Sequence, residues 1–252
     1  MAGLLGFVRG VGGTVRLLGE VLACVARPPW EVRRILDEMD ELGVRSLSIA
    51  NLTAIFTGMV LALQTSYSLR KFGALTLVPD IVSLSMAREL GPVLTALMVG
   101  GRVGAGITAE IGSMKVTEQV DAIRALGADP VKKLAWPKVA ALFVVLPALT
   151  MLAIFVGIFL GGVLISVLEL QQGIDYFYHE VISALSVGDL LSGIGKSFFF
   201  ALIIAVIGCQ NGLTAKGGAD GVGRATTNTV VAASITILVA DFFLTKIFLM
   251  VL

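Results

Sequence analysis

Seven charged side chains interrupt stretches of the chain that are otherwise strongly apolar. They are Arg88, Glu89, Arg102, Glu110, Lys196, Asp241 and Lys246. A charge that faces lipid hydrocarbon costs at least ~2.5 kcal/mol, so such side chains face protein or a water-filled cavity instead. There they can form ion pairs or bind a charged group of a ligand. The chemistry that these residues offer is therefore electrostatic and non-covalent.

The residue types needed for covalent or metal chemistry are scarce. His179 is the only histidine and lies in a polar stretch, while Cys24 and Cys209 lie far apart in apolar surroundings. A zinc site or a serine- or cysteine-histidine dyad requires such groups close together. We therefore predict no catalytic residue and no metal ligand, and we interpret both cysteines as packing residues.

Two glycine patterns resemble nucleotide-binding loops without meeting their requirements. Gly195-Lys196-Ser197 matches the end of a phosphate-binding loop, but Leu190 stands where that motif requires Gly. The glycines between 100 and 106 lie inside an apolar stretch, where small residues let membrane helices approach closely. We do not expect the chain itself to bind ATP or a dinucleotide.

The composition is that of a polytopic membrane protein. Of the 252 residues, 56% are hydrophobic and 15% are charged, and the mean hydropathy is +0.93. Ordinary soluble domains contain more charge and less apolar surface. The formal net charge of +1 gives no electrostatic support for a nucleic-acid partner.

Five stretches are long enough to cross the hydrocarbon as helices, which takes about 20 residues each. The sequence predicts spans at 46–69, 84–112, 139–168, 190–213 and 228–252. The second and fifth spans contain most of the charges, so we expect them to be buried in the helix bundle. The predicted fold class is all-α, with residues 1–252 forming one polytopic membrane domain.

The first 45 residues have the pattern of amphipathic helices that lie in the membrane interface. Apolar residues recur at helical spacing among charges, at Val8, Val11, Val15, Leu18, Leu22 and Val25, and a second such piece runs from Trp30 to Leu42. A cleaved signal peptide is the alternative. Arg16 and Glu20 argue against it, because they break the apolar region that a signal peptide requires.

The positions of Lys and Arg predict the orientation. Residues 1–45, 111–138 and 214–227 contain six, five and two of them, thirteen in all, whereas the opposite loops contain only Arg70 and Lys71. Loops rich in Lys and Arg stay in the cytoplasm. The N-terminus is therefore expected inside and the C-terminus outside.

Several longer motifs are specific in combination. They are Arg88-Glu89-Leu90-Gly91-Pro92, Gly101-Arg102, Thr108-Ala109-Glu110-Ile111-Gly112, Thr117-Glu118-Gln119, and Arg224-Ala225-Thr226-Thr227 with the following Asp241. On these motifs the chain resembles the MlaE-type (YrbE-like) permease subunits of lipid ABC transporters. The resemblance covers nearly the whole chain.

This resemblance implies a non-catalytic permease in the bacterial inner membrane, acting as a homodimer, with an N-terminal elbow helix. It implies a cytoplasmic ABC ATPase that binds ATP and Mg, and a periplasmic MCE-domain carrier; it also allows a small STAS-domain protein on the ATPase. The implied substrate is phospholipid, exchanged between the inner membrane and the carrier in support of outer-membrane lipid asymmetry.

The loop at 113–137 has the charge order of a short helix. Thr117 is expected to cap it, with acidic residues in the first turn and a basic residue later, as the helix dipole favours. Residues 121–127 also resemble the coupling helix of other ABC permeases, which docks on the ATPase. The residues assigned to that contact are Glu118, Asp121, Arg124 and Gly127. From the residues alone, a merely solvated loop is the alternative.

A mainly apolar stripe with one amide lies near the outer end of the first span. Its members are Leu61, Gln64, Ser68, Leu69 and Phe72. Such a surface suits acyl chains, and ordinary helix packing is the alternative. Arg88 and Glu89 lie at similar depth on the second span, where they either contact a headgroup or pair with charges on neighbouring helices.

Lys196 and Asp241 are expected to form an intramembrane ion pair, because opposite charges at similar depth in the membrane tend to pair. Direct contact of these residues with lipid is the alternative. Two other functions also remain open for the chain as a whole. One is an ATP-independent scaffold or channel for a lipid-carrier complex, and the other is an importer of sterol-like apolar metabolites.

Overall fold

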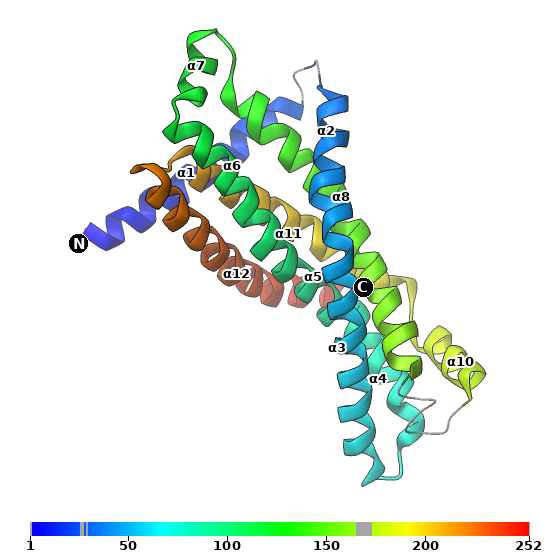
Figure 1. Cartoon of the computed structure of the whole chain (residues 1–252). Helices are drawn as coiled ribbons and strands as arrows, with labels where there is room; N and C mark the ends of the chain where they lie inside the picture. Colours follow the sequence, from blue (N-terminus) through cyan, green and yellow to red (C-terminus); the bar gives the residue numbers. More distant parts are fainter. Residues whose placement is uncertain (1, 26–27, 29, 165–172, 252) are drawn as a thin grey trace. The chain divides into compact units, whose positions relative to one another are not determined.

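The computed structural model describes residues 2–25, 28, 30–164 and 173–251. In these residues the chain is built from helices and contains no strand, which confirms the all-α class (Figure 1). Five helices in this part of the chain are long and apolar enough to cross a membrane, in agreement with the predicted number. Residues 165–168 and 252 of the predicted spans lie outside the described residues.

Most of these membrane helices consist of α-helical segments joined by short π-helical or 3-10 turns. The first contains α2 (Val32–Met39), η1 (Asp40–Val44) and α3 (Arg45–Arg70). The second contains η2 (Leu75–Leu77), α4 (Val78–Ser85), η3 (Met86–Leu90), α5 (Gly91–Val99), η4 (Gly100–Gly104) and α6 (Ala105–Val116). The third contains η5 (Val131–Ala135), α8 (Trp136–Val156) and η6 (Gly157–Gly162). The fourth and fifth are α11 (Val187–Leu213) and α12 (Gly218–Val251).

Within the described residues, three further helices lie outside these five. They are α1 (Ala2–Val25), α7 (Gln119–Ala125) between the second and third membrane helices, and α10 (Ile174–Ala184). The amphipathic piece expected at 30–42 is not separate, because α2 continues through η1 into α3 as one helix, Val32–Arg70. Its Glu, Arg and Leu residues all favour helix, so the helix extends beyond the apolar window.

The chain divides into two compact units, each assembled from separate stretches. The first unit contains residues 1–44, 99–145 and 201–237, and the second contains residues 45–98, 146–200 and 238–252. Each of the five membrane helices contributes residues to both units. We describe the packing of each unit by itself.

Small residues on one side of α3 create close helix packing in the second unit. They recur every four residues and are all buried: Ser46, Ala50, Ala54, Gly58, Ala62 and Ser66. A methyl group on Gly58 would lie 2.0 Å from the carbonyl oxygen of Gly157 in η6, so the two backbones are in direct contact. Membrane helices associate through this kind of close approach, because lipid tails are as apolar as the helices themselves.

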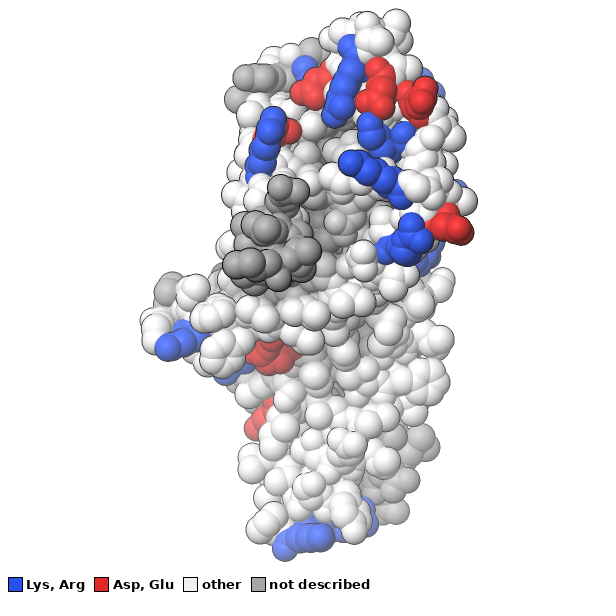
Figure 2. All heavy atoms as spheres, turned by 90° about the vertical axis from the view of Figure 1, so that its left-hand side faces the viewer, with Lys and Arg blue, Asp and Glu red and all other residues white. Residues whose placement is uncertain are grey.

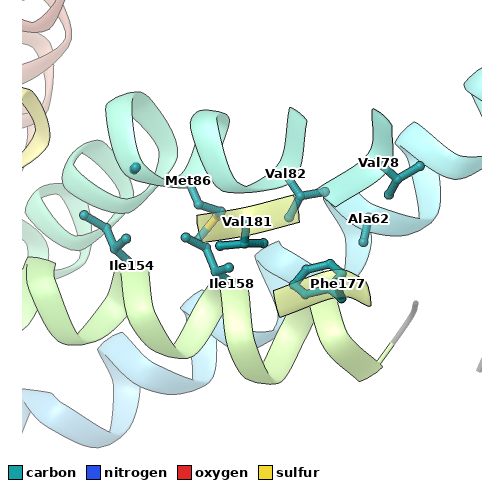
Figure 3. Packing of buried hydrophobic residues seen from close by; sticks show 9 residues of the cluster. Ala62, Val78, Val82, Met86, Ile154, Ile158, Phe177 and Val181 are labelled. Atoms are coloured by element: carbon teal, nitrogen blue, oxygen red, sulfur yellow. The ribbon is translucent and has the colours of Figure 1, made fainter. Parts of the chain in front are cut away.

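Larger apolar side chains fill the rest of this unit's core. In Figure 3, residues from α4 and η3 face residues from α8 and η6, and α10 adds two more side chains. The cluster consists of Ala62, Val78, Val82, Met86, Ala87, Ile154, Ile158, Phe177 and Val181. The core therefore fixes η3, the turn that contains Arg88 and Glu89.

A buried polar contact joins three helices of the first unit. The hydroxyl oxygen of Thr108 on α6 lies 3.0 Å from the carbonyl oxygen of Gly208 on α11 and 2.8 Å from the hydroxyl oxygen of Thr229 on α12. Asn211 also donates to the Thr229 hydroxyl at 2.8 Å. Interhelical hydrogen bonds of this kind hold membrane helices together where apolar surface alone gives little preference.

Candidate functional site

An open groove of about 510 Å³ lies along α3 in the second unit. Its lining is mainly apolar and includes two threonines and one amide. The residues are Leu52, Thr53, Phe56, Thr57, Val60, Leu61 and Gln64 of α3, with Leu90 of η3. Apolar grooves with a few polar groups are typical of sites for ligands with long apolar parts.

The five apolar-stripe residues predicted from the sequence have different surroundings. Leu61 and Gln64 line the groove, whereas Leu69 packs against the core cluster of the second unit. Ser68 donates its hydroxyl proton to the Gln64 carbonyl oxygen at 2.9 Å, and Phe72 is exposed in the turn after α3. The groove thus contains only two of the five residues.

The remaining groove residues were missed by the sequence analysis. Three of these six, Leu52, Phe56 and Val60, continue the same helical face toward the N-terminus of α3. A four-residue repeat of large apolar side chains, opposite the buried small residues of α3, is the signal that identifies them.

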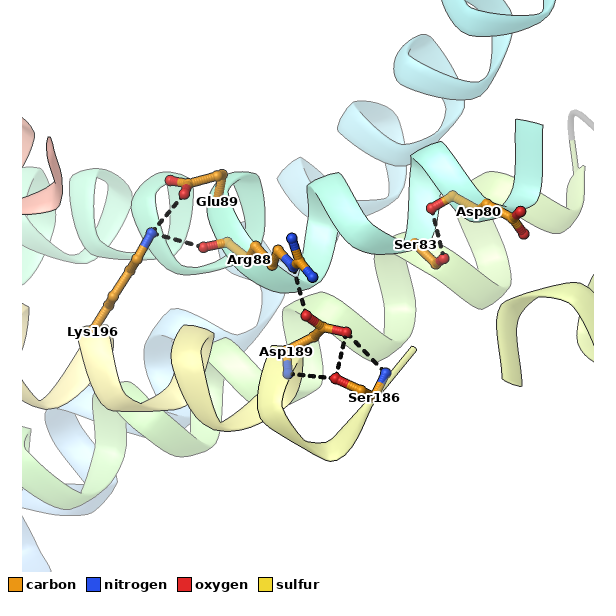
Figure 4. Close-up of polar contacts among 7 residues, drawn as sticks. All are labelled: Asp80, Ser83, Arg88, Glu89, Ser186, Asp189 and Lys196. Atoms are coloured by element: carbon orange, nitrogen blue, oxygen red, sulfur yellow. Dashed lines mark hydrogen bonds and ion pairs between the residues drawn. The ribbon is translucent and has the colours of Figure 1, made fainter. Parts of the chain in front are cut away.

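The π-helical turn η3 directs three consecutive residues into different surroundings. Arg88 forms an ion pair with Asp189, and Glu89 contacts Lys196 (Figure 4). Leu90 lines the groove. A π-helical turn inserts an extra residue into the helix, and such turns are frequent at functional sites. The charged residues and the apolar groove therefore adjoin each other within one unit.

Lys196 is the buried centre of the charged cluster, with 1% of its side chain exposed. Its ammonium group donates to the Arg88 carbonyl oxygen at 2.9 Å, to Glu89 Oε1 at 2.8 Å and to the Thr245 hydroxyl at 2.7 Å. These three bonds use all the protons of the ammonium. Asp241 Oδ1 lies 3.1 Å away as an ion-pair partner, but it is buried and accepts no hydrogen bond.

The structure thus places Lys196 beside Asp241, as the sequence suggested, and adds Glu89 as the carboxylate that Lys196 bonds directly. Glu89 and Thr245 were not connected with Lys196 by the sequence analysis. They lie more than 40 positions away along the chain, so no local pattern identifies the contact.

Arg88 is held by the first turn of α11. Its Nε donates to Asp189 Oδ1 at 2.5 Å. Asp189 also accepts from the backbone N–H and the hydroxyl of Ser186, both at 2.8 Å, and its own N–H donates to the Ser186 hydroxyl oxygen. This reciprocal arrangement is a capping box, which fixes the start of the helix. Arg88 and Glu89 therefore pair with other helices, yet 43% and 38% of their side chains stay exposed.

The helix expected in the 113–137 loop is α7, but its start differs from the prediction. Thr117 does not cap it, because its hydroxyl donates back to the Ser113 carbonyl oxygen at the end of α6. Glu118 takes the position before the first turn, with a φ of 63° and no capping bond from its side chain. The sharp left-handed turn at Glu118 separates α7 from α6, which leaves Thr117 with the preceding helix.

The end of α7 is a Schellman motif centred on Gly127. The backbone N–H of Gly127 donates to the carbonyl oxygen of Arg124, and the N–H of Ala128 donates to the carbonyl oxygen of Ile123. Gly127 itself has a φ of +76°. Glycine adopts this left-handed conformation without the strain that a Cβ atom causes. Gly127 therefore contributes to α7 through its backbone.

Side chains of both charge signs gather at the end of the first unit that contains α7 (Figure 2). Lys115 donates to both oxygens of Asp121, at 2.7 and 3.0 Å, and Arg124 lies 3.4 Å from the same carboxylate. The hydrogen bond from Lys115 holds the pKa of Asp121 below its usual range. Beside them Leu126 is 86% exposed, an apolar side chain that the sequence analysis did not select. An exposed apolar side chain at this position gains stability if a partner covers it, because covering removes apolar surface from water.

Comparison with known proteins identifies the family of the chain. The family model described as Permease MlaE matches residues 35–247. A probable ABC transporter permease protein of Rickettsia felis is 39% identical over 96% of this chain and 93% of its own length. One from Synechocystis is 41% identical over 90% of this chain and 86% of its own.

A chloroplast relative extends the comparison to plants. The Arabidopsis thaliana protein named TRIGALACTOSYLDIACYLGLYCEROL 1 is 35% identical over 92% of this chain and 66% of its own length. These permeases each cover most of the chain, and the residues matched by the family model include the groove, the Lys196 cluster and α7. The chain is therefore a membrane permease that belongs to the MlaE family.

Proposed function

We propose that this permease moves phospholipid between the bacterial inner membrane and a periplasmic MCE-domain carrier, driven by a separate cytoplasmic ATPase that binds ATP and Mg. The observation that supports a phospholipid most directly is the junction at η3. There an apolar groove adjoins a charged cluster, so that one molecule with acyl chains and an ionic headgroup can contact both. The chain itself contributes no covalent chemistry.

The polarity of the groove and of the charges beside it supports an amphiphile over a wholly apolar substrate. Thr53, Thr57 and Gln64 offer polar contacts along one edge, and the exposed parts of Arg88 and Glu89 offer one charge of each sign. A sterol-like molecule would leave both charges without a ligand group. The Arabidopsis relative bears the name of a diacylglycerol glycolipid, which also favours a lipid with two acyl chains.

Coupling to the ATPase is assigned to α7. The relatives are named as ABC transporter permeases, a class that works with an ATPase. The proposed orientation places α7 and the N-terminus in the cytoplasm and the end of α12 in the periplasm. It follows from the basic residues of the loops on the α7 side. Two copies of the permease form the transport unit in this proposal, with a small STAS-domain protein as a further component on the ATPase.

The groove can be tested by filling it. Val60→Trp puts an indole ring into the groove, whereas Leu63→Trp puts the same ring on a half-exposed position of α3 that does not line the groove. We expect Val60→Trp to reduce ATP-dependent transfer of a fluorescent phospholipid severalfold in proteoliposomes containing the ATPase, and Leu63→Trp to leave it near wild type. Mass spectrometry of co-purified lipids should show loss of bound phospholipid only in Val60→Trp.

Three outcomes would contradict the proposal. Equal transport by both variants would exclude this groove as the lipid path. A sterol-like molecule in the wild-type preparation, displaced by Val60→Trp, would favour the importer of apolar metabolites. Lipid transfer that proceeds without ATP would favour the scaffold or channel.

A further inference from the structure

Each compact unit contains one lysine that is almost completely buried between carboxylates. In the second unit it is Lys196, which belongs to the site described above. In the first unit it is Lys138 on α8, with 2% of its side chain exposed. Lys138 donates to both oxygens of Glu38, at 2.7 and 2.9 Å, and to Glu110 Oε2 at 2.7 Å. All three protons of the ammonium are therefore used.

Two of the three residues lie on the helices that flank α7 in the chain. Glu110 lies on α6, which leads into α7, and Lys138 lies on α8, which follows it. Glu38 lies on α2, far away in the sequence. A cation buried between two carboxylates is costly to leave unpaired, so the contact fixes the three helices together.

A second ion pair shows how α2 runs along the start of α8. Lys133 contacts Glu31 just before α2, and Lys138 contacts Glu38 near its end. The residue numbers rise together in the two segments, from Lys133 with Glu31 to Lys138 with Glu38. The segment containing α2 therefore runs parallel to the start of α8. Lys133 and Glu31 are about 40% exposed, so this outer pair contributes little stability and Lys138 is the central contact.

α2 is also the beginning of the helix that lines the groove. Val32–Arg70 is one continuous helix, with Glu38 near one end and the groove residues Leu52 to Gln64 further along. A displacement of α7 that reaches α6 and α8 is therefore transmitted to this helix wherever Lys138 holds Glu38.

We infer that Lys138 is a positioning residue that links the ATPase-facing helix α7 to the first membrane helix through Glu38 and Glu110. The inference rests on the proposed function for the identity of α7 as the ATPase contact. It assigns a role to Glu110, whose charge inside the second membrane helix is not explained by the lipid site. Lys138 contacts no substrate and acts only through the helices that it joins.

The test compares wild type with Lys138→Met/Glu38→Gln and Lys133→Met, each purified with the ATPase and reconstituted in liposomes. The double variant removes the buried cation together with one carboxylate partner, which protects the fold better than removing the lysine alone. Lys133→Met makes the same change in the exposed pair and serves as the matched control. Two quantities are measured: phospholipid transferred per ATP hydrolysed, and hydrogen exchange of residues 32–39 with and without ATP and vanadate.

We expect the double variant to hydrolyse ATP while its lipid transfer per ATP falls about tenfold, a loss within the range of coupling in charged networks. Hydrogen exchange of residues 32–39 should respond to nucleotide in wild type and Lys133→Met but not in the double variant. The inference is overturned if the double variant matches wild type both in phospholipid transferred per ATP and in the response of hydrogen exchange to nucleotide. Loss of hydrolysis and transport in equal proportion also overturns it, because that result indicates a purely structural role.

Two further results remain decisive. If wild type transfers no lipid on ATP addition, the proposed function fails, and the hydrogen-exchange response of residues 32–39 alone decides the role of Lys138.

If the double variant does not fold, Glu110→Gln takes its place. Glu110 is 53% exposed, and its replacement leaves the Lys138–Glu38 pair intact. If Glu110→Gln transfers as much phospholipid per ATP as wild type, and its hydrogen exchange responds to nucleotide as in wild type, the inference is overturned. Reduced phospholipid transfer per ATP in this variant supports the inference.

Discussion

At the scale of single residues, two lysine ammonium groups account for several of the charges inside the membrane helices, because each ammonium uses its three protons in hydrogen bonds. Lys196 and Lys138 each donate three hydrogen bonds, and each lies between two carboxylates. The buried charge is tolerated because its bonds are complete. The two carboxylates around Lys196 are not equivalent, since Glu89 accepts hydrogen bonds and Asp241 Oδ1 accepts none.

This difference predicts unequal effects of neutralising the two acids. Glu89→Gln weakens bonds from both Lys196 and Thr245, and we expect it to cost about 1.5–3 kcal/mol of unfolding free energy, as for hydrogen bonds to charged groups. Asp241→Asn removes a charge that accepts no bond at Oδ1, and we expect a cost of less than ~1 kcal/mol, within the usual range of a single substitution. Unfolding titrations in mixed micelles measure both values, and equal costs would contradict the assignment of Glu89 as the principal partner.

At the scale of helices, the small residues of α3 determine how closely it approaches η6. Gly58 and Gly157 are in backbone contact, whereas a methyl group on Gly106 of α6 would meet no atom within 4 Å. Gly58 and Gly106 both lie in membrane helices, yet only at Gly58 would a side chain collide with a neighbouring helix. Gly58 is needed for close approach, and Gly106 is not needed for packing within the described part of the chain.

Alanine substitution separates these two cases. We expect Gly58→Ala to destabilise the protein by about 1–3 kcal/mol, because the added methyl group forces the backbones of α3 and η6 apart. Gly106→Ala should be neutral or slightly stabilising, since alanine favours helix over glycine. Thermal unfolding of both variants in the same detergent tests the comparison, and a larger loss in Gly106→Ala would exclude the close packing of α3 against η6.

The helices were predictable from the sequence, and so was the ion pair of Lys196 with Asp241, but the partners in the other charged contacts were not. Uncharged windows identify spans because charge in hydrocarbon is costly. The partner of Glu89 lies 107 positions away, and that of Glu110 lies 28 positions away on another helix. Local patterns carry no information on such pairs. Thr117 was misassigned because Glu118 adopts a left-handed conformation that is rare for residues other than glycine.

At the scale of the whole molecule, the permease needs a contact through which an ATPase can act on it. α7 lies between the second and third membrane helices and is held by Lys115, Asp121 and the turn at Gly127. These contacts keep the helix in place without covering its outer surface. Leu126, at the end of α7, therefore remains available to a partner.

Leu126→Ser tests whether this side chain is the anchor of the ATPase contact. Because Leu126 is 86% exposed, its replacement removes little packing and should leave the thermal stability of the permease unchanged. Loss of an apolar anchor at the centre of an interface costs about 2 kcal/mol or more, so we expect ATPase affinity to fall by at least ~tenfold in a binding assay with purified subunits. Ile182→Ser on α10 is the matched control, because Ile182 is 70% exposed and lies in the other unit. Unchanged affinity in Leu126→Ser would mean that the ATPase docks on another surface, whereas equal losses in both variants would indicate a general effect of removing exposed apolar side chains.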